Sequence, residues 1–183
     1  MTILVFGGNG QLGQELLRTL VPEERVVATT RSGLLPDGTP CERADFEHPE
    51  TLVAVLERLR PSWVLNAAAY TSVDRAEDEP DVARRINEIA PGVIARWCAL
   101  ADVPMVHYST DYVFDGNACR PYREDDATAP LGVHGPASLP AKMPFVLQVA
   151  AIWFSEQHGC THLTARIFCR RCCGSALTAT FCG

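Results

Sequence analysis

Three glycines follow the first apolar run of the chain, and their spacing constrains the fold more than any other feature. Residues 3–7 are apolar and end in Gly7, after which Gly10 and Gly13 recur at intervals of three. Residues 11–20 then place leucines on one helical face. A glycine turn between a buried strand and an amphipathic helix is typical of the first unit of a doubly wound sheet.

The rest of the first 135 residues continues this alternation of strand and helix patterns. Strands are expected at residues 3–7, 25–30, 63–68 and 104–110, helices at 11–20, 49–60, 80–89 and 91–101, and a loop rich in glycine and proline at 31–45. Nearly continuous apolar strands separated by helices indicate a parallel sheet covered on both faces. The prediction is therefore an α/β fold with a doubly wound, Rossmann-type NAD(P)-binding sheet.

The glycine turn is also a candidate phosphate site. Gly7 allows the tight turn, Gly10 lets the backbone approach a pyrophosphate, and Gly13 lets helix pack on strand. The amides of Gly10, Gln11 and Leu12 would then point at phosphate from a helix N-terminus. The alternative is a tight strand-to-helix turn that holds no ligand.

The end of the second strand bears on the choice between NADH and NADPH. A carboxylate there would accept a hydrogen bond from the ribose 2′-hydroxyl, but the sequence reads Thr29-Thr30-Arg31-Ser32. Arg31 could pair with a 2′-phosphate, with Ser32 as an additional donor, which favours NADPH. The alternative is an arginine that is simply exposed on a loop.

Charge and hydropathy exclude several classes of partner. The chain of 183 residues has a formal net charge of −6, which argues against binding nucleic acid through phosphates. No apolar run approaches the length of a membrane span. The first residues enter a strand pattern without a basic stretch, unlike a secretory signal. We expect a cytoplasmic protein with neither a nucleic-acid nor a membrane partner.

Composition changes near residue 135. Residues 1–135 hold 12 of the 16 Lys and Arg and 21 of the 22 Asp and Glu, so the remainder, 136–183, is basic. Five of the eight cysteines lie in the last 24 residues, among them Cys169, Cys172 and Cys173. Their spacing does not match a zinc site, and no metal is expected. We expect a Rossmann domain at 1–135 and an aberrant tail at 136–183.

Four segments together resemble dTDP-4-dehydrorhamnose reductase, a family of the extended short-chain dehydrogenase/reductase superfamily that carries an RmlD-like substrate-binding domain. They are ILVFGGNGQLGQEL (3–16), RPSWVLNAAAYTSVDRAEDEP (60–80), INEIAPGVIA (86–95) and VHYSTDYVFDGNACRPYREDDATAPLGVHG (106–135). The last is the most specific, because STDYVFDG followed by PYREDD is characteristic of this family. The resemblance covers residues 1–135 and does not continue beyond them.

The resemblance implies a set of site residues. Cofactor contacts would fall on Gly10, Gln11, Leu12, Asp45, Phe46, Ala69, Tyr70, Thr71 and Tyr108. Thr110 matches the hydroxyl residue of the family's Thr/Tyr/Lys catalytic set, and Asp111 matches a carboxylate that contacts substrate. For Asp111 the alternative is a helix or turn cap, and for Tyr70 it is packing on a loop. A threonine at the carboxyl end of a strand can donate to a sugar ketone.

The implied reaction is reduction of a dTDP-linked 4-keto-6-deoxy sugar, dTDP-4-dehydro-6-deoxy-L-mannose, to dTDP-L-rhamnose with NADPH or NADH. A tyrosine would protonate the new alkoxide, and a lysine four residues later would lower the pKa of that tyrosine. Glu15 aligns with a family glutamate that is linked to a metal-bridged dimer. This single match does not decide the oligomeric state, and a homodimer is one alternative.

The catalytic pair departs from the family. His134 stands at the tyrosine position and Ser138 at the lysine position, while Lys142 comes four residues too late. His134 could donate a proton near neutral pH, but Ser138 supplies no positive charge. The expected substrate lobe is also absent. The segment ASLPAKMPF (137–145) can be encoded by bases that read KLAGENAV in another frame, and KLAGE follows the family's tyrosine segment. We hypothesise a single-base deletion near codons 135–137.

Three functions are compatible with this sequence. The first is the reductase of nucleotide-sugar metabolism, which STDYVFDG and Asp111 favour. The second is a non-catalytic dinucleotide-binding module that regulates a partner, which the loss of tyrosine and lysine favours. The third is an inactive fragment. Binding of NADPH without turnover would leave the second and the third.

Overall fold

The computed structural model describes residues 1–21, 24–110, 113–117, 127 and 129, together with the backbone of three later strands at 146–150, 162–167 and 177–182. The strands are β1 (Thr2–Phe6), β2 (Arg25–Thr30), β3 (Glu42–Arg43), β4 (Trp63–Asn66), β5 (Met105–Ser109), β6 (Val146–Ala150), β7 (His162–Ile167) and β8 (Leu177–Cys182). The helices are α1 (Gln11–Leu20), η1 (Pro49–Thr51), α2 (Leu52–Leu59), α3 (Val73–Asp78), α4 (Pro80–Arg84), η2 (Arg85–Ile89) and α5 (Ala90–Leu100).

The main sheet is parallel and doubly wound, as the alternation of elements predicts. Its strand order is β3-β2-β1-β4-β5-β6, and every neighbouring pair is parallel. The chain moves outward from β1 through β2 to β3 and then returns to place β4 on the other side of β1. This reversal creates the point at which open α/β sheets bind ligands. β6 lies beyond residue 135, and β7 and β8 form a separate antiparallel pair.

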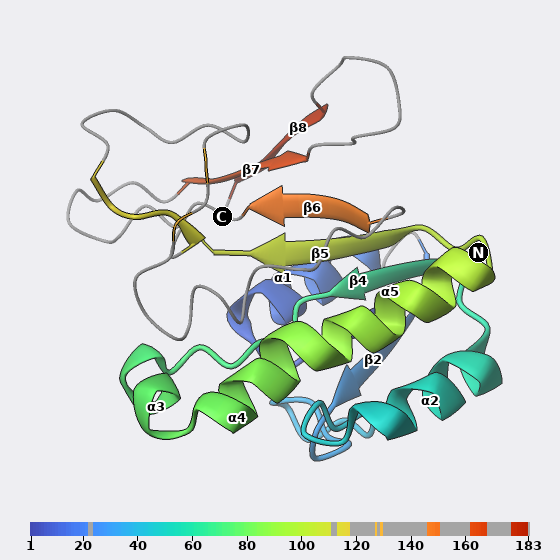
Figure 1. Ribbon diagram of the computed structural model, residues 1–183. Coiled ribbons are helices and arrows are strands. Elements are labelled where there is room, and N and C mark those ends of the chain that lie inside the picture. Colours follow the sequence, from blue (N-terminus) through green and yellow to red (C-terminus); the bar gives the residue numbers. More distant parts are fainter. Residues whose placement is uncertain are drawn as a thin grey trace.

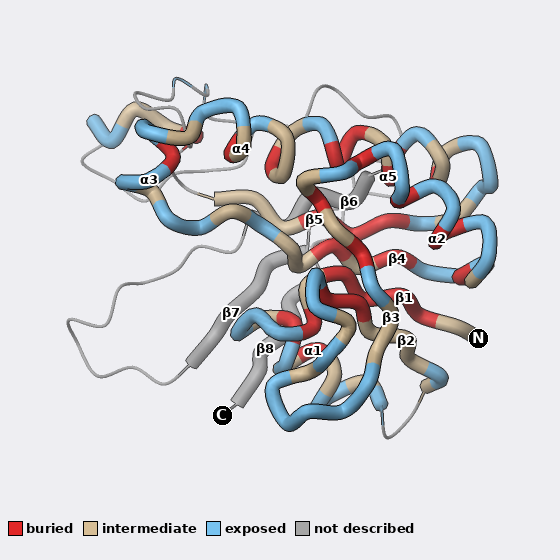
Figure 2. Tube along the Cα trace, turned by 90° about the horizontal axis from the view of Figure 1, so that it is seen from below, coloured by how far each residue is buried: buried red, intermediate tan, exposed pale blue. Residues whose placement is uncertain are grey.

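Helices cover both faces of the sheet because successive strand residues point in opposite directions. Leu4 and Phe6 of β1 pack with Leu56 of α2 and Ile94 of α5, whereas Val5 packs with the leucines of α1. Figure 1 shows α2 and α5 in front of the strands and α1 behind them. Figure 2 shows the buried positions concentrated along the central strands. No helix in the described part of the chain is long and apolar enough to cross a membrane.

The junction of β1 with α1 requires glycine at two positions. Gly7 has φ +81°, and a Cβ there would lie 2.6 Å from the amide nitrogen of Ala68. A Cβ on Gly13 would lie 2.0 Å from the carbonyl oxygen of Gly7. Both distances are far inside van der Waals contact with backbone atoms, which cannot move aside without shifting β4 or α1. The tight turn at Gly7 and the close approach of α1 to β1 at Gly13 are therefore possible only because glycine has no Cβ.

The two helices expected at 80–89 and 91–101 are joined in the structure, which corrects the sequence prediction. The chain runs as α4, a π-helical turn (η2) and α5 without a break. Pro91 has no N–H, and its ring crowds the carbonyl four residues earlier. The wider turn before it, in which the amide of Ala90 donates to the carbonyl of Arg85, accommodates the proline without ending the helix.

Two short elements are absent from the sequence prediction. The loop expected at 31–45 contains β3, which pairs through Thr29 with Glu42 and through Thr30 with Arg43. The segment after β4 contains α3, a helix of six residues. Both are too short to show a periodic pattern. The strands β1, β2, β4 and β5 agree with their expected positions to within two residues.

The glycine junction gives a stability prediction. Gly13→Ala should destabilise the fold by at least about 3 kcal/mol, because the clash with the Gly7 carbonyl far exceeds the gain of about 1 kcal/mol in helix propensity. Gly10→Ala should cost less than about 1 kcal/mol, because Gly10 has φ −76° and a Cβ there would meet the Gly7 oxygen at an ordinary 3.5 Å. Urea denaturation of both variants measures the difference, and equal midpoints would contradict this account of the junction.

Candidate functional site

A pocket of about 1300 Å³ lies along the carboxyl ends of the parallel strands. Its lining comes from the β1–α1 turn, the ends of β2 and β5, the turn after β3 and the loop after β4. Of the sequence-predicted site residues that the structure describes, Gly13 and the proposed additional donor Ser32 are outside the lining. The pocket brings the others together: Gly7, Gly10, Gln11, Leu12, Arg31, Asp45, Phe46, Ala69, Tyr70, Thr71, Tyr108 and Thr110.

The first turn of α1 faces this pocket. Gly10 is the N-cap of α1, no side chain caps the helix, and the first turn holds no acidic residue. The first amides of an α-helix have no partner inside the helix and attract anions. The structure corrects one detail of the sequence prediction, because the amide of Gly10 already donates to the carbonyl of Gly7 at 3.0 Å. Gln11 and Leu12 therefore present the amides suited to a phosphate.

Gly10 leaves space that the protein itself does not use. It lines the pocket, and among the described residues the one atom within 4 Å of a Cβ placed there is the Gly7 oxygen, at 3.5 Å. The fold therefore does not require glycine at this position, unlike Gly7 and Gly13. A glycine beside a helix N-terminus lets a ligand come close to the backbone. The residues present thus fit the pyrophosphate of a dinucleotide.

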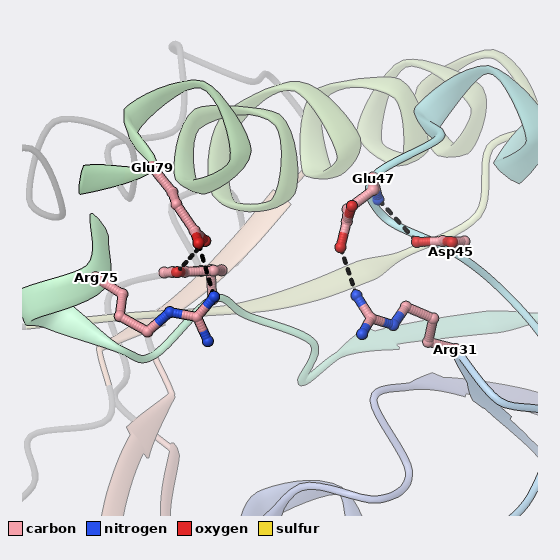
Figure 3. Close-up of polar contacts among 6 residues, drawn as sticks. Arg31, Asp45, Glu47, Arg75 and Glu79 are labelled. Atoms are coloured by element: carbon pink, nitrogen blue, oxygen red, sulfur yellow. Dashed lines mark hydrogen bonds and ion pairs between the residues drawn. The ribbon is translucent and has the colours of Figure 1, made fainter. Parts of the chain in front are cut away.

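The ends of β2 and β3 bring charged side chains to one wall of the pocket. Arg31 forms an ion pair with Glu47 through Nη1 and Oε1 (Figure 3). Asp45 accepts the backbone amide of Glu47 at 3.0 Å and so holds the turn after β3. Phe46 is buried with its ring 5.5 Å from the ring of Phe6, so its backbone rather than its ring is available to a ligand. The sequence prediction missed Glu47.

The loop after β4 is held by the helix with the π turn. The side chain of Asn87 accepts the backbone amide of Tyr70 at 2.8 Å and donates to the carbonyl of the same residue at 3.1 Å. Asn87 is buried on η2. This two-point contact fixes the peptide groups next to Ala69 and Thr71, which are exposed on the pocket lining. A buried amide with two backbone bonds is a rigid support.

The phenol of Tyr70 belongs to a polar cluster at the other end of the lining. Its hydroxyl donates to Glu79 at 2.8 Å. Arg75 donates to the second oxygen of Glu79 at 2.7 Å (Figure 3). The bonds from Arg75 and Tyr70 lower the pKa of Glu79. The bond to the carboxylate raises the pKa of Tyr70, so the phenol stays protonated at neutral pH. Both alternatives for Tyr70, loop packing and cofactor contact, are compatible with this half-buried position.

The end of β5 supplies the innermost wall. Tyr108 and Thr110 line the pocket, and burial raises the pKa of Tyr108 to about 12. His107 is buried beside them, with its Nδ1 3.0 Å from Nδ2 of Asn66. Because Asn66 Oδ1 accepts the amide of Ala68, Nδ2 is the donor and His107 Nδ1 the acceptor. Burial lowers the pKa of His107 to about 4, so the imidazole is neutral with its proton on Nε2.

Several predicted residues lie outside the described part of the chain. They are the substrate-contacting Asp111, the proton-donor candidate His134, the neighbouring Ser138 and Lys142, and the tail cysteines Cys169, Cys172 and Cys173. The structure therefore describes the cofactor side of the predicted site together with Thr110.

Comparison with known proteins agrees with this geometry. The family model described as RmlD substrate binding domain matches residues 1–143, somewhat past the 135 residues of the sequence resemblance. The dTDP-4-dehydrorhamnose reductases of Burkholderia thailandensis and Escherichia coli K12 are 43% and 42% identical to this chain over 139 residues. Those matches cover 76% of this chain and 43% and 44% of the two relatives, so the chain spans less than half of their length.

A solved structure of a dTDP-4-dehydrorhamnose reductase is also similar to this chain. The dTDP-4-dehydrorhamnose reductase of Bacillus anthracis, in complex with NADP, superposes with a TM-score of 0.65 at 33% identity. The superposition covers 75% of this chain and 46% of the other.

The buried histidine gives a pH prediction. In the unfolded chain His107 binds a proton near pH 6.5, whereas in the folded chain it does so only near pH 4. Between these values the unfolded state binds more protons, so stability falls as the pH falls. At pH 5 the loss relative to pH 8 should be about 2 kcal/mol. His107→Asn, which keeps an acceptor for Asn66, should lose less stability over this range in urea denaturation. Equal pH dependence of both proteins would contradict the assignment.

Proposed function

This chain belongs to the RmlD substrate binding domain family, and we propose that its pocket binds NADPH or NADH for the reduction of dTDP-4-dehydro-6-deoxy-L-mannose to dTDP-L-rhamnose. The observation that carries the proposal is the space beside Gly10 at the start of α1, where the amides of Gln11 and Leu12 face the pocket. The NADP in the Bacillus anthracis relative supports a dinucleotide as the ligand. Asp45, Tyr70 and Tyr108, with the loop after β4, would then enclose the cofactor.

The reduced nicotinamide supplies the hydride that converts the sugar ketone to an alkoxide. Thr110, at the carboxyl end of β5, donates its hydroxyl to the ketone oxygen and stabilises the charge that develops there. Asp111, which matches a family carboxylate that contacts substrate, would bind the sugar. His134 stands where a tyrosine would protonate the alkoxide, and Ser138 stands where a lysine would lower the pKa of that donor.

We assign the cofactor half of the reaction to residues 1–135 and expect chemistry in this chain to be impaired. The described site presents Thr110 but no lysine, since the one lysine of the sequence is Lys142. An untuned histidine without a neighbouring cation is a poor replacement for the Tyr/Lys pair. The basic segment at 136–183 begins near the point where the match to the longer relatives ends, after 139 matched residues that cover 44% of the Escherichia coli relative.

A second candidate function is supported by the same substitution. A chain that keeps the phosphate turn and loses the proton donor would bind a dinucleotide without consuming it. Such a protein serves as a binding module for a partner. His134 and Ser138 favour this alternative, and turnover with the keto sugar separates it from the reductase.

The dinucleotide proposal predicts the effect of filling the space at Gly10. Gly10→Ala should weaken NADPH binding at least tenfold while the thermal midpoint changes little, because the methyl group occupies the position of the pyrophosphate. Titration of nicotinamide fluorescence measures the affinity. Gly38→Ala is the control, because Gly38 has φ +84° and lies outside the pocket lining. It should lose stability and keep its affinity. Unchanged binding in Gly10→Ala would contradict the proposed phosphate position.

The impaired catalytic pair predicts the kinetics. The chain should bind NADPH yet oxidise it with the dTDP-keto sugar at least about 10²-fold more slowly than a complete reductase, because general acid catalysis is worth ~10²–10⁴. His134→Tyr alone should recover little, because the lysine and the sugar lobe act on the same transition state. Restoring the alternative frame after codon 135 should recover activity. A normal rate in the unaltered chain would overturn the assignment and direct attention to His134 and Lys142.

A further inference from the structure

The ion pair between Arg31 and Glu47 joins two segments that are 16 residues apart in sequence at one point of the pocket wall. Arg31 follows β2 directly, and Glu47 follows β3. Three contacts hold the turn that carries Glu47. Asp45 accepts its amide, the amide of His48 donates to the carbonyl of Asp45 at 3.1 Å, and Phe46 anchors the turn in the core. The turn therefore delivers a carboxylate to the end of β2.

In a doubly wound sheet that binds a dinucleotide, side chains at the end of the second strand contact the adenosine ribose. A carboxylate there accepts a hydrogen bond from the 2′-hydroxyl of NADH, whereas an arginine pairs with the 2′-phosphate of NADPH. Residues 29–32 carry no carboxylate. The structure supplies one from Glu47, so both types of determinant lie at the same place.

We propose, on the basis of the dinucleotide function above, that Glu47 is a specificity-determining residue that weakens the preference of this chain for NADPH. Arg31 alone would favour the 2′-phosphate. With Glu47 bound to its guanidinium and Asp45 next to it, the wall carries one positive and two negative groups. A 2′-phosphate, with a charge of about −1.5 to −2, must either displace Glu47 from the guanidinium or share the guanidinium with it, and in both cases it lies near the Glu47 carboxylate. A 2′-hydroxyl can instead donate to Glu47 and leave the pair intact.

The ion pair between Arg31 and Glu47 is exposed to solvent, so a bound nucleotide can reach both side chains. The side chain of Arg31 is 68% exposed and that of Glu47 is 34% exposed. An ion pair of this exposure contributes little to folding, so a ligand can compete for the guanidinium. Because the pair is exposed, replacing Glu47 should leave the fold intact. A change in nucleotide affinity in the variant then reports on the lost carboxylate and not on unfolding.

The experiment compares Glu47→Gln with the wild-type chain. Dissociation constants for NADPH and NADH come from nicotinamide fluorescence, and those for 2′,5′-ADP and 5′-ADP from calorimetry, so no turnover is needed. Removing the carboxylate should raise the NADPH-to-NADH affinity ratio about tenfold at low salt, mainly by tightening NADPH. The ratio for 2′,5′-ADP against 5′-ADP should rise similarly. Arg31→Gln should change both ratios in the opposite direction.

Glu50→Gln is the matched control. Glu50 is a 72% exposed carboxylate on η1, 3.4 Å from His48 and outside the pocket lining. It tests for a general effect of lost negative charge, and its ratios should stay within twofold of the wild-type values. Ratios in Glu47→Gln that stay within twofold would overturn the proposal, as would an equal rise in Glu50→Gln. Failure of every nucleotide to bind the wild-type chain would overturn the proposed function and this inference with it.

Discussion

The approach of α1 to the end of β1 is the contact on which the rest of the site depends. Gly13 lies so close to the carbonyl of Gly7 that a Cβ would stand 2.0 Å from its oxygen, and a Cβ on Gly7 would stand 2.6 Å from the amide nitrogen of Ala68 in the loop after β4. Three segments therefore meet through backbone atoms alone. Their contact places the first amides of α1 at the reversal of strand order, where the pocket opens.

From this junction the pocket wall is built by turns that the core holds in place. Phe46 packs the turn after β3 against Phe6 of β1, and Asn87 holds the loop after β4 against the helix with the π turn. Asn66 and His107 form a buried, neutral hydrogen-bonded pair across the neighbouring strands β4 and β5. A site supported in this way presents its backbone groups without rearrangement, which suits the binding of a rigid diphosphate.

The fold and the location of the site could be predicted from the sequence because both follow from strong periodic signals. The strand pattern alone places Arg31 and Thr110 at the carboxyl ends of parallel strands, where ligands bind, whereas Tyr70 was added by the family resemblance. The joining of two helices across Pro91 was not predictable, because the π turn that absorbs the proline has no sequence signature. Glu47 was missed because β3 has two residues and shows no alternation. The roles of Asp111 and His134 stay predictions, since both lie outside the described residues.

The central claim is that a dinucleotide lies along the carboxyl edge of the sheet, from the start of α1 to the end of β5. Amide hydrogen exchange of the intact chain, measured with and without saturating NADPH, tests it most directly. The account predicts slower exchange in peptides covering residues 7–12, 31–47 and 67–71, with α2, on the covered face of the sheet, unchanged. Unaltered exchange in all three segments while NADPH is bound, or protection confined to other segments, would contradict it.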